Sequence, residues 1–285
     1  THLDKKGLLM LCQTDKALEE EIKVAEIAQK EGLEVTTLNS EELAKIEPEV
    51  KIEAKGAVHF LCDWHSTPQS FMERLKDYLI KEGVTIIKNE KINAVNFKSK
   101  NIISVSSDRN SYTADEFVFT SGAWTKQLCR KLGIHLLLEP GKGYRINVYR
   151  DTGISLPAIL VESKVAITPM DGFTRFAGTM EIAGVNHAIN PIRVEAIAKA
   201  ANKYYPDIEI HEEEKSEAAC GLRPVTPDGM PYIGRLSGYK NLTIATGHAM
   251  MGWTMGASTG KLVSEIISHK KTSIGIDAFH PDRRF

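Results

Sequence analysis

The sequence has few cysteines, and their spacing excludes two common uses of this residue. Its four cysteines, at positions 12, 62, 129 and 220, lie far apart in a chain of 285 residues. They form no Cys-x-x-Cys pair and no zinc-ligand spacing, so neither a disulfide framework nor a zinc site is indicated, and no metal site is expected. This usage fits a reducing compartment, and we expect buried thiols in a cytoplasmic protein.

Long runs of one charge and long apolar runs are also absent. The 36 Lys and Arg residues nearly balance the 37 Asp and Glu residues, and no basic stretch could neutralise a phosphate backbone, so nucleic-acid binding is excluded. No stretch approaches the roughly 20 apolar residues of a membrane span, and Thr1–Lys6 lacks a signal-peptide pattern. Peripheral membrane association and homo-oligomerisation leave no signature in such a sequence, and both stay open.

The two commonest phosphate-binding fingerprints are missing as well. A P-loop in the glycine-rich stretch after position 246 would require glycine at 255 and Ser or Thr at 262, where the chain has Met255 and Leu262. A dinucleotide Gly-x-Gly-x-x-Gly motif beginning at Gly141 fails because Ile146 stands where the third glycine belongs. The chain therefore carries neither motif.

What is present is a pattern of alternating strands and helices. In the first third, hydrophobic periodicity and helix-start residues predict two strands and three helices. The strands are 7–12 and 56–61, and the helices are 15–30, one that starts with Ser40 as N-cap and stops before Pro48, and one from Thr67-Pro68 to Gly83.

The remaining two thirds are predicted to be richer in strands. A β-meander follows, with strands at 84–88, 91–97, 102–106 and 117–120, and then a short helix at 123–132. An antiparallel section has strands near Val148 and at 159–161, 166–167 and 175–177. The last two helices are predicted at 191–204 and 254–269.

Two features in the last quarter can carry chemistry. The strand 242–246 leads through a glycine-rich loop into a helix, which is a common anion site because the free N–H groups of a helix start face the loop. The alternative is tight packing of helix on strand. Arg223 precedes a Thr-Pro-Asp-Gly turn, and its fork suits a carboxylate. The alternative is an ion pair with Glu217 or Asp228.

These motifs carry a family resemblance. The run Gly221–Gly234, followed by Asn241–His248, Gly252 and Ala257–Gly260, resembles the C-terminal signature of the D-amino acid oxidase (DAO) superfamily of FAD-dependent oxidoreductases. Within it the chain is most similar to the D-amino acid dehydrogenase small subunit and glycine oxidase branches. Weaker matches in the same order are Ser121–Trp124, Pro140–Tyr144 and Ala177–Gly184.

The resemblance implies an α/β fold with two parts. One is a glutathione-reductase-like FAD domain, truncated at its N-terminal βαβ unit, and the other is an antiparallel-sheet α+β substrate domain. The family's N-terminal dinucleotide-binding segment is lacking, so the sequence corresponds to the pattern from roughly 80 to 100 residues onward. We expect an exposed sheet edge where that segment's strands would pair. The expected division is an N-terminal piece on the substrate side (1–56), FAD-domain segments (57–138 and 219–272), a substrate domain (139–218) and a tail (273–285).

The resemblance also implies a function: FAD-dependent oxidative deamination of a D-amino acid or related amine, with hydride passing from Cα to flavin N5. Arg223 would bind the substrate carboxylate and Tyr144 would add a hydrogen bond. No catalytic base is assigned, because a substrate amine that arrives neutral needs none. The residues matched to cofactor contacts are Val95, Ser121, Gly122, Ala123, Trp124, Gly221, Gly247, His248, Met251, Gly252, Trp253 and Thr254.

Alternatives remain at this point. Within the superfamily, the substrate could instead be sarcosine, hydroxyproline or a 2-hydroxy acid, all of which carry a carboxylate. From a different class, the chain could be a flavin-free, non-catalytic fragment. For Val95, Trp124, His248 and Trp253 the alternative to cofactor contact is ordinary packing.

Overall fold

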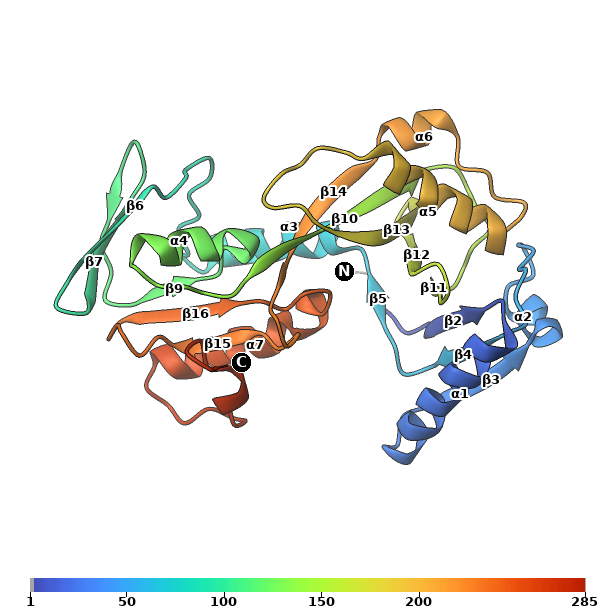
Figure 1. The fold of residues 1–285 in the computed structure, drawn as a ribbon, viewed down its shortest axis with the longest axis horizontal. Coiled ribbons are helices and arrows are strands. Elements are labelled where there is room, and N and C mark those ends of the chain that lie inside the picture. Colours follow the sequence, from blue (N-terminus) through green and yellow to red (C-terminus); the bar gives the residue numbers. More distant parts are fainter. Residues whose placement is uncertain (1–2, 285) are drawn as a thin grey trace. The chain divides into compact units, whose positions relative to one another are not determined.

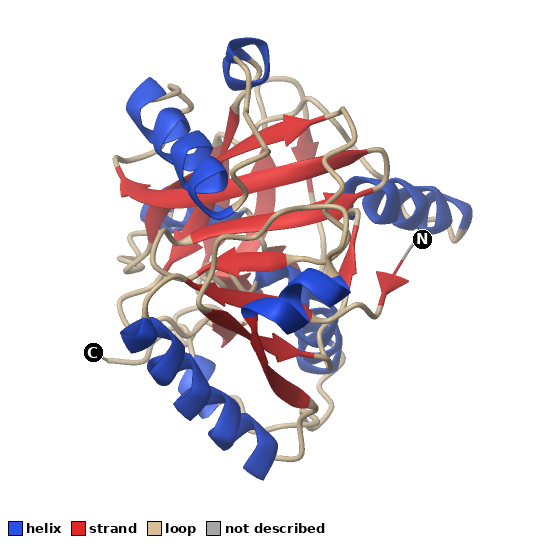
Figure 2. Ribbon diagram, turned by 90° about the vertical axis from the view of Figure 1, so that its right-hand side faces the viewer, coloured by secondary structure: helices blue, strands red, loops and turns tan. Residues whose placement is uncertain are grey.

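The computed structural model describes residues 3–284, which divide into two compact units. Of the described residues, the first comprises 3–85, 143–180 and 188–220, and the second comprises 86–142, 181–187 and 221–284. The structure contains both helices, blue in Figure 2, and strands, red in the same view. Residues 57–85 group with the first unit, whereas the sequence places them in a segment expected to belong to the FAD domain. Which unit serves the cofactor and which the substrate stays a prediction.

The largest sheet has eight strands in the order β14-β10-β13-β12-β11-β2-β4-β3 (Figure 1). Neighbours β2, β4 and β3 are antiparallel, as are β11, β12 and β13, while β11 and β2 run parallel. A separate two-stranded sheet pairs β1 with β5. The bounds of these strands are Leu3–Asp4 (β1), Leu8–Cys12 (β2), Val35–Asn39 (β3), Gly56–Phe60 (β4), His65–Ser66 (β5), Glu139–Val148 (β10), Ala158–Leu160 (β11), Val165–Met170 (β12), Phe173–Ile182 (β13) and Ala219–Val225 (β14).

Local capping residues determine where most helices of the first unit begin. Thr14 caps α1 (Asp15–Lys30) by accepting a hydrogen bond from the Ala17 N–H, and Asn190 caps α5 (Pro191–Tyr204) in the same way through Ile192. The N-cap of α2 (Ser40–Ile46) is Asn39 and not Ser40, because Asn39 forms a reciprocal capping box with Glu42. The short helix α6 spans Glu212–Ser216.

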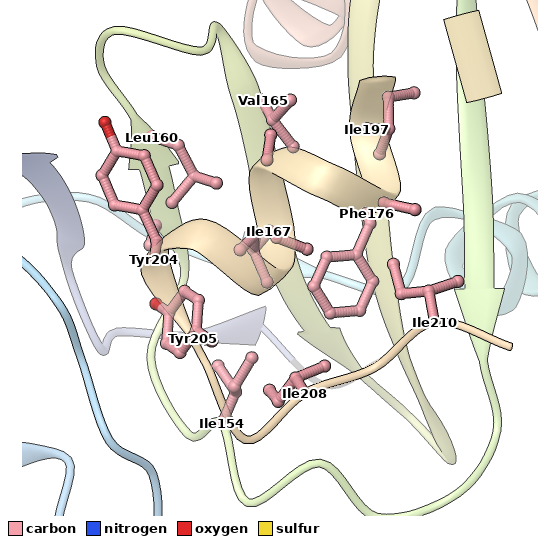
Figure 3. Close-up of a cluster of buried hydrophobic side chains, with 14 of the residues drawn as sticks. Ile154, Leu160, Val165, Ile167, Phe176, Ile197, Tyr204, Tyr205, Ile208 and Ile210 are labelled. Atoms are coloured by element: carbon pink, nitrogen blue, oxygen red, sulfur yellow. The ribbon is translucent and has the colours of Figure 1, made fainter. Parts of the chain in front are cut away.

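The core of the first unit lies between the sheet and helix α5. Figure 3 shows its centre, where side chains from β11, β12, β13 and α5 meet Tyr205 and the segment 208–210. Phe176, Ile167 and Ile197 are completely buried. Burial of large apolar side chains is the main force that holds such layers together. Ten of these residues are labelled in the figure: Ile154, Leu160, Val165, Ile167, Phe176, Ile197, Tyr204, Tyr205, Ile208 and Ile210.

Helix α3 (Pro68–Lys81) forms where its proline and apolar spacing predict, yet none of its residues is buried. Met72 and Tyr78 are 52% and 58% exposed. Thr67, the predicted N-cap, makes no capping hydrogen bond and instead accepts one from the Asp171 N–H at 3.0 Å. Proline at the helix start therefore fixes this terminus without a side-chain cap.

The second unit contains two three-stranded sheets, with orders β15-β16-β9 and β6-β7-β8. Strands β9 and β16 are parallel, and β9 is an edge: within residues 3–284 no strand pairs with its outer side. The elements of this unit are β6 (Ala94–Lys98), β7 (Asn101–Ser106), β8 (Ser111–Tyr112), β9 (Phe117–Phe119), β15 (Tyr232–Arg235), β16 (Leu242–Thr246), the 3₁₀ turns η1 (Gly122–Trp124) and η2 (Asp277–Phe279), and the helices α4 (Thr125–Lys131) and α7 (Gly252–Ile267).

The second unit has its own hydrophobic core. Its buried side chains include Phe117, Phe119 and Ile244.

Two expectations from the sequence are wrong. Residues 84–88 are not a strand, because no neighbouring strand of the described chain pairs with them. The expectation of four buried thiols was also too broad: Cys12 and Cys129 are buried, but Cys62 and Cys220 are only partly so.

Candidate functional site

Arg223 projects from β14 and holds a guanidinium group that the protein does not neutralise. Its Nη1 atom is buried and has no hydrogen-bond partner, and within residues 3–284 no carboxylate pairs with it. Burial lowers the pKa of the guanidinium, but arginine stays charged at neutral pH. A buried donor without a partner is costly, so the site favours a ligand that accepts from it. A carboxylate matches this requirement in charge and shape.

The alternative of an ion pair with Asp228 is wrong, because Asp228 has another partner. Arg283 binds it with a two-pronged contact, Nε to Oδ2 at 2.9 Å and Nη2 to Oδ1 at 2.9 Å. Arg283 also lies over the Tyr232 ring, 4.1 Å from its centroid. This pair lowers the pKa of Asp228 to about 2. The carboxylate nearest to Arg223 in sequence is therefore already engaged.

The loop after β16 is fastened to the strand that carries Arg223. The Ala249 N–H donates to the Pro224 carbonyl at 2.9 Å. Gly247 has φ +86°, and a Cβ there would lie 2.7 Å from Thr226 Cγ2. Only glycine permits both this backbone conformation and this close approach. The predicted cofactor loop and the predicted carboxylate anchor are thus held in fixed register within the second unit.

Helix α7 begins at Gly252 with no side-chain cap. Met251 occupies the N-cap position and forms no capping hydrogen bond, while its own N–H donates to the His248 carbonyl at 2.8 Å. Residues 250–254 are all exposed. An uncapped helix start carries partial positive charge. Met251, Gly252, Trp253 and Thr254, which the sequence matched to cofactor contacts, surround this charge.

His248 is oriented by a contact inside the same unit. One of its ring nitrogens, Nε2, lies 2.9 Å from Thr259 Oγ1. Burial lowers the pKa of the imidazole, so the ring is neutral at physiological pH. His248 is therefore a positioned, uncharged ring.

The turn Ser121–Trp124 lies at the end of β9 and is tied to β16. Thr246 Oγ1 donates to the Gly122 carbonyl at 3.1 Å, and Ala123 is buried. Trp124 is 39% exposed and stacks on His187, with ring centroids 6.0 Å apart at 18°. The predicted turn therefore presents an aromatic face beside the ends of both parallel strands.

A cavity of about 600 Å³ adjoins this turn. It includes Ser121 and Trp124, two of the residues predicted from the sequence. The other residues of the wall, two lysines among them, belong to no motif in the sequence and lie in the segment before β6 and on α4. They are Glu90, Lys91, Ile92, Asn93, Gln127, Leu128 and Lys131. Lysines at 91 and 131 give this cavity positive charge.

The remaining predicted residues differ in accessibility. Val95 lies on the edge strand β6 with its side chain buried, so only its main chain could meet a ligand. Gly221 is exposed, and nothing lies within 4 Å of a Cβ built on it. Tyr144 belongs to the first unit, where it is 1% exposed and part of the core.

Comparison with solved structures identifies the class of fold. The glycine oxidase of Geobacillus kaustophilus superposes with a TM-score of 0.89 at 21% identity, covering 99% of this chain and 76% of that one. The L-proline dehydrogenase of P. horikoshii gives 0.85 at 19% identity, covering 98% and 76%. The chain therefore has the mixed α/β fold of these two enzymes, as predicted.

Sequence comparison identifies the family. The family described as DAO, FAD dependent oxidoreductase, matches residues 1–266. A D-amino acid dehydrogenase of Vibrio vulnificus (strain CMCP6) is 32% identical over 285 residues, which cover 96% of this chain and 67% of the relative. One from Neisseria meningitidis is 31% identical over 281 residues, covering 96% and 66%. The chain belongs to the DAO family of FAD-dependent oxidoreductases.

The second unit contains features that fit an FAD cofactor. The uncapped start of α7 suits an electron-rich flavin edge, and the lysine-lined cavity beside Ser121 and Trp124 suits an anionic nucleotide. Across residues 3–284 no cluster of His, Cys, Asp or Glu could hold a metal ion. Over the same residues no helix is both long enough and apolar enough to cross a membrane.

Proposed function

We propose that this chain acts in the FAD-dependent oxidation of a D-amino acid, with Arg223 as the anchor for the substrate carboxylate. The observation that carries the proposal is the buried, unpartnered Nη1 of Arg223, next to a loop that leads into an uncapped helix start. The family membership and the names of the relatives support the same chemistry.

The proposed roles follow from the contacts. Arg223 binds the carboxylate through its fork and so fixes which face of the substrate Cα is presented. The hydrogen bond from Ala249 to Pro224 keeps this anchor in register with the loop at 247–251. Gly252–Thr254 and Trp124 would contact the flavin. When bound, FAD supplies the two-electron oxidation of the amine.

Proton transfer needs no side chain of this unit. His248 already contacts Thr259, and its lowered pKa makes it a weak base. When the substrate amine is neutral, the Cα–H bond is the only bond at Cα that has to break. Loss of hydride leaves a protonated imino acid, which water hydrolyses to a 2-oxo acid with release of ammonium.

Replacement of Arg223 tests the anchor. We expect Arg223→Gln to raise KM for the substrate roughly 30- to 1,000-fold, a loss of about 2 to 4 kcal/mol, since a charge-assisted pair is removed. Arg223→Lys should retain part of the binding because it keeps the charge but loses the fork. Binding of pyruvate, the 2-oxo acid from D-alanine, gives a second measurement without turnover and should weaken in parallel.

Arg109→Gln is the matched control, because it removes an exposed arginine from a turn of the same unit. Flavin absorbance of the purified protein shows whether FAD is bound before and after each change. Unchanged KM and pyruvate affinity in Arg223→Gln would contradict the anchor. A colourless protein that also fails to bind added FAD would favour the flavin-free fragment for this chain.

A further inference from the structure

The open face of the sheet in the first unit carries two arginines that the proposed function does not use. Residues alternate between the two faces of a strand. On β10 the even positions Tyr144 and Ile146 are buried in the core, so Arg145 lies on the opposite face. On β13 Phe176 is buried in the same core, and Arg175 lies on the open face.

Arg175 is held in place by its neighbours on that face. Its Nε donates to Asn147 Oδ1 at 3.0 Å, and Asn147 Nδ2 donates in turn to the Tyr149 hydroxyl at 3.3 Å. The guanidinium carbon lies 5.3 Å from the centroid of the Phe173 ring. These contacts use Nε and one face of the group, and they leave Nη1 and Nη2 without a hydrogen-bond partner among residues 3–284.

Neither arginine has a counter-ion among residues 3–284. Within the part of the chain that the structure describes, no carboxylate lies within ion-pair distance of Arg145 or Arg175. Burial and then the positive charge of Arg145 lower the pKa of Arg175. By contrast, Arg150, two residues beyond the end of β10, pairs with Glu214 at 3.3 Å. Two neighbouring, half-buried cations without an anion are unfavourable unless a ligand brings the negative charge.

We propose that Arg145 and Arg175 form a second carboxylate-binding site, on the open face of β10 and β13. Arginine forks match the planar geometry of a carboxylate. The rings of Phe173 and Tyr149, with centroids 5.5 Å apart, provide an apolar flank for the carbon chain of a small organic acid. In choosing an amino acid as the source of this carboxylate, the inference rests on the proposed function. With the α-carboxylate on Arg223, an acidic side chain supplies this second carboxylate; if Arg223 is not the anchor, the α-carboxylate itself supplies it.

Binding of succinate tests the site without any turnover. The titration is done by calorimetry at constant ionic strength, in an Arg223→Gln background so that Arg223 cannot account for the signal. We expect Arg145→Gln and Arg175→Gln each to weaken succinate binding roughly 10- to 100-fold. Arg150→Gln is the matched control: it removes the same charge from the same region, and its effect should stay below about threefold.

Conservative variants guard against misfolding. Arg145→Lys and Arg175→Lys keep the charge and should restore part of the affinity. Succinate affinity that is the same in all these variants, or that falls equally in Arg150→Gln, would overturn the site. Because this result does not involve Arg223 or flavin, it stands or fails separately from the proposed function.

The holoenzyme then distinguishes the two sources of carboxylate. If the pair binds the α-carboxylate, Arg145→Gln raises KM for D-alanine and D-glutamate by the same factor. If it binds an acidic side chain, KM rises about 10-fold or more for D-glutamate only. Unchanged KM for both substrates would overturn a role of this site in substrate binding.

Discussion

Gly247 joins β16 to the loop that leads into α7, and its backbone conformation excludes other residues. With φ at +86° and Thr226 Cγ2 at 2.7 Å from a built Cβ, alanine would be both strained and too close to its neighbour. We expect Gly247→Ala to lower the free energy of unfolding by about 2 to 4 kcal/mol, the sum of backbone strain and overpacking. Urea unfolding, followed by circular dichroism, measures this change.

Gly229→Ala separates the two contributions. Gly229 also has positive φ, +75°, but nothing lies within 4 Å of its built Cβ. Its substitution should therefore cost only the strain, about 1 kcal/mol. Equal losses for both variants would mean that contact with Thr226 contributes nothing at Gly247.

At the scale of elements, the pair Asp228–Arg283 fastens the end of the described chain to the turn after β14. Arg283 also donates to the carbonyls of Met230 and Pro231, at 2.6 and 3.1 Å. The pair holds the folded pKa of Asp228 at about 2, below its ordinary value of 3.8. The carboxylate therefore stabilises the folded state above pH about 4, and this contribution disappears as the pH falls through 2.

Asp228→Asn should remove this contribution. The difference in unfolding free energy between wild type and Asp228→Asn is expected to be constant above pH about 4 and to shrink toward zero as the pH approaches 2. At neutral pH, hydrogen exchange of residues 280–284 should become faster in the variant. A difference that does not change with pH would show that the carboxylate charge is not what fastens this segment.

Helices were predictable from the sequence because their signals are local. Proline at 68 and 191 and polar caps at 14 and 190 fix α1, α3 and α5 to within one or two residues. The stretch 84–88 has the composition of a strand, but a strand exists only when another strand pairs with it. Whether a partner strand exists depends on residues far away in the sequence, so the local pattern could not exclude a strand at 84–88.

The candidate site was predictable only where a continuous motif carries it. Arg223 and the loop at 247–254 lie in two glycine-rich motifs close together in the sequence, and both belong to the second unit. Arg145 and Arg175 are thirty residues apart and gain meaning only when β10 and β13 place them on one face. Lys91 and Lys131 meet at a cavity for the same reason. Such sets need the pairing of strands and helices before they can be recognised.

At the scale of the whole molecule, the two units have separate hydrophobic cores. The first unit's core includes Phe176, which is completely buried, and the second unit's core includes Phe119, which is 6% exposed. Side chains that pack in different cores stabilise different sets of strands. Local opening can then occur in one unit while the other stays folded.

A matched pair of core substitutions tests this separation. We expect Phe176→Ala and Phe119→Ala each to cost about 3 to 5 kcal/mol in the unit that contains it. Hydrogen exchange should accelerate in β12 and β13 for Phe176→Ala, and in β9 and β16 for Phe119→Ala, with the other pair of strands less affected. If both variants accelerate exchange equally in all four strands, the chain unfolds as one cooperative body. A substitution of Arg223 in the second unit would then also destabilise the first unit.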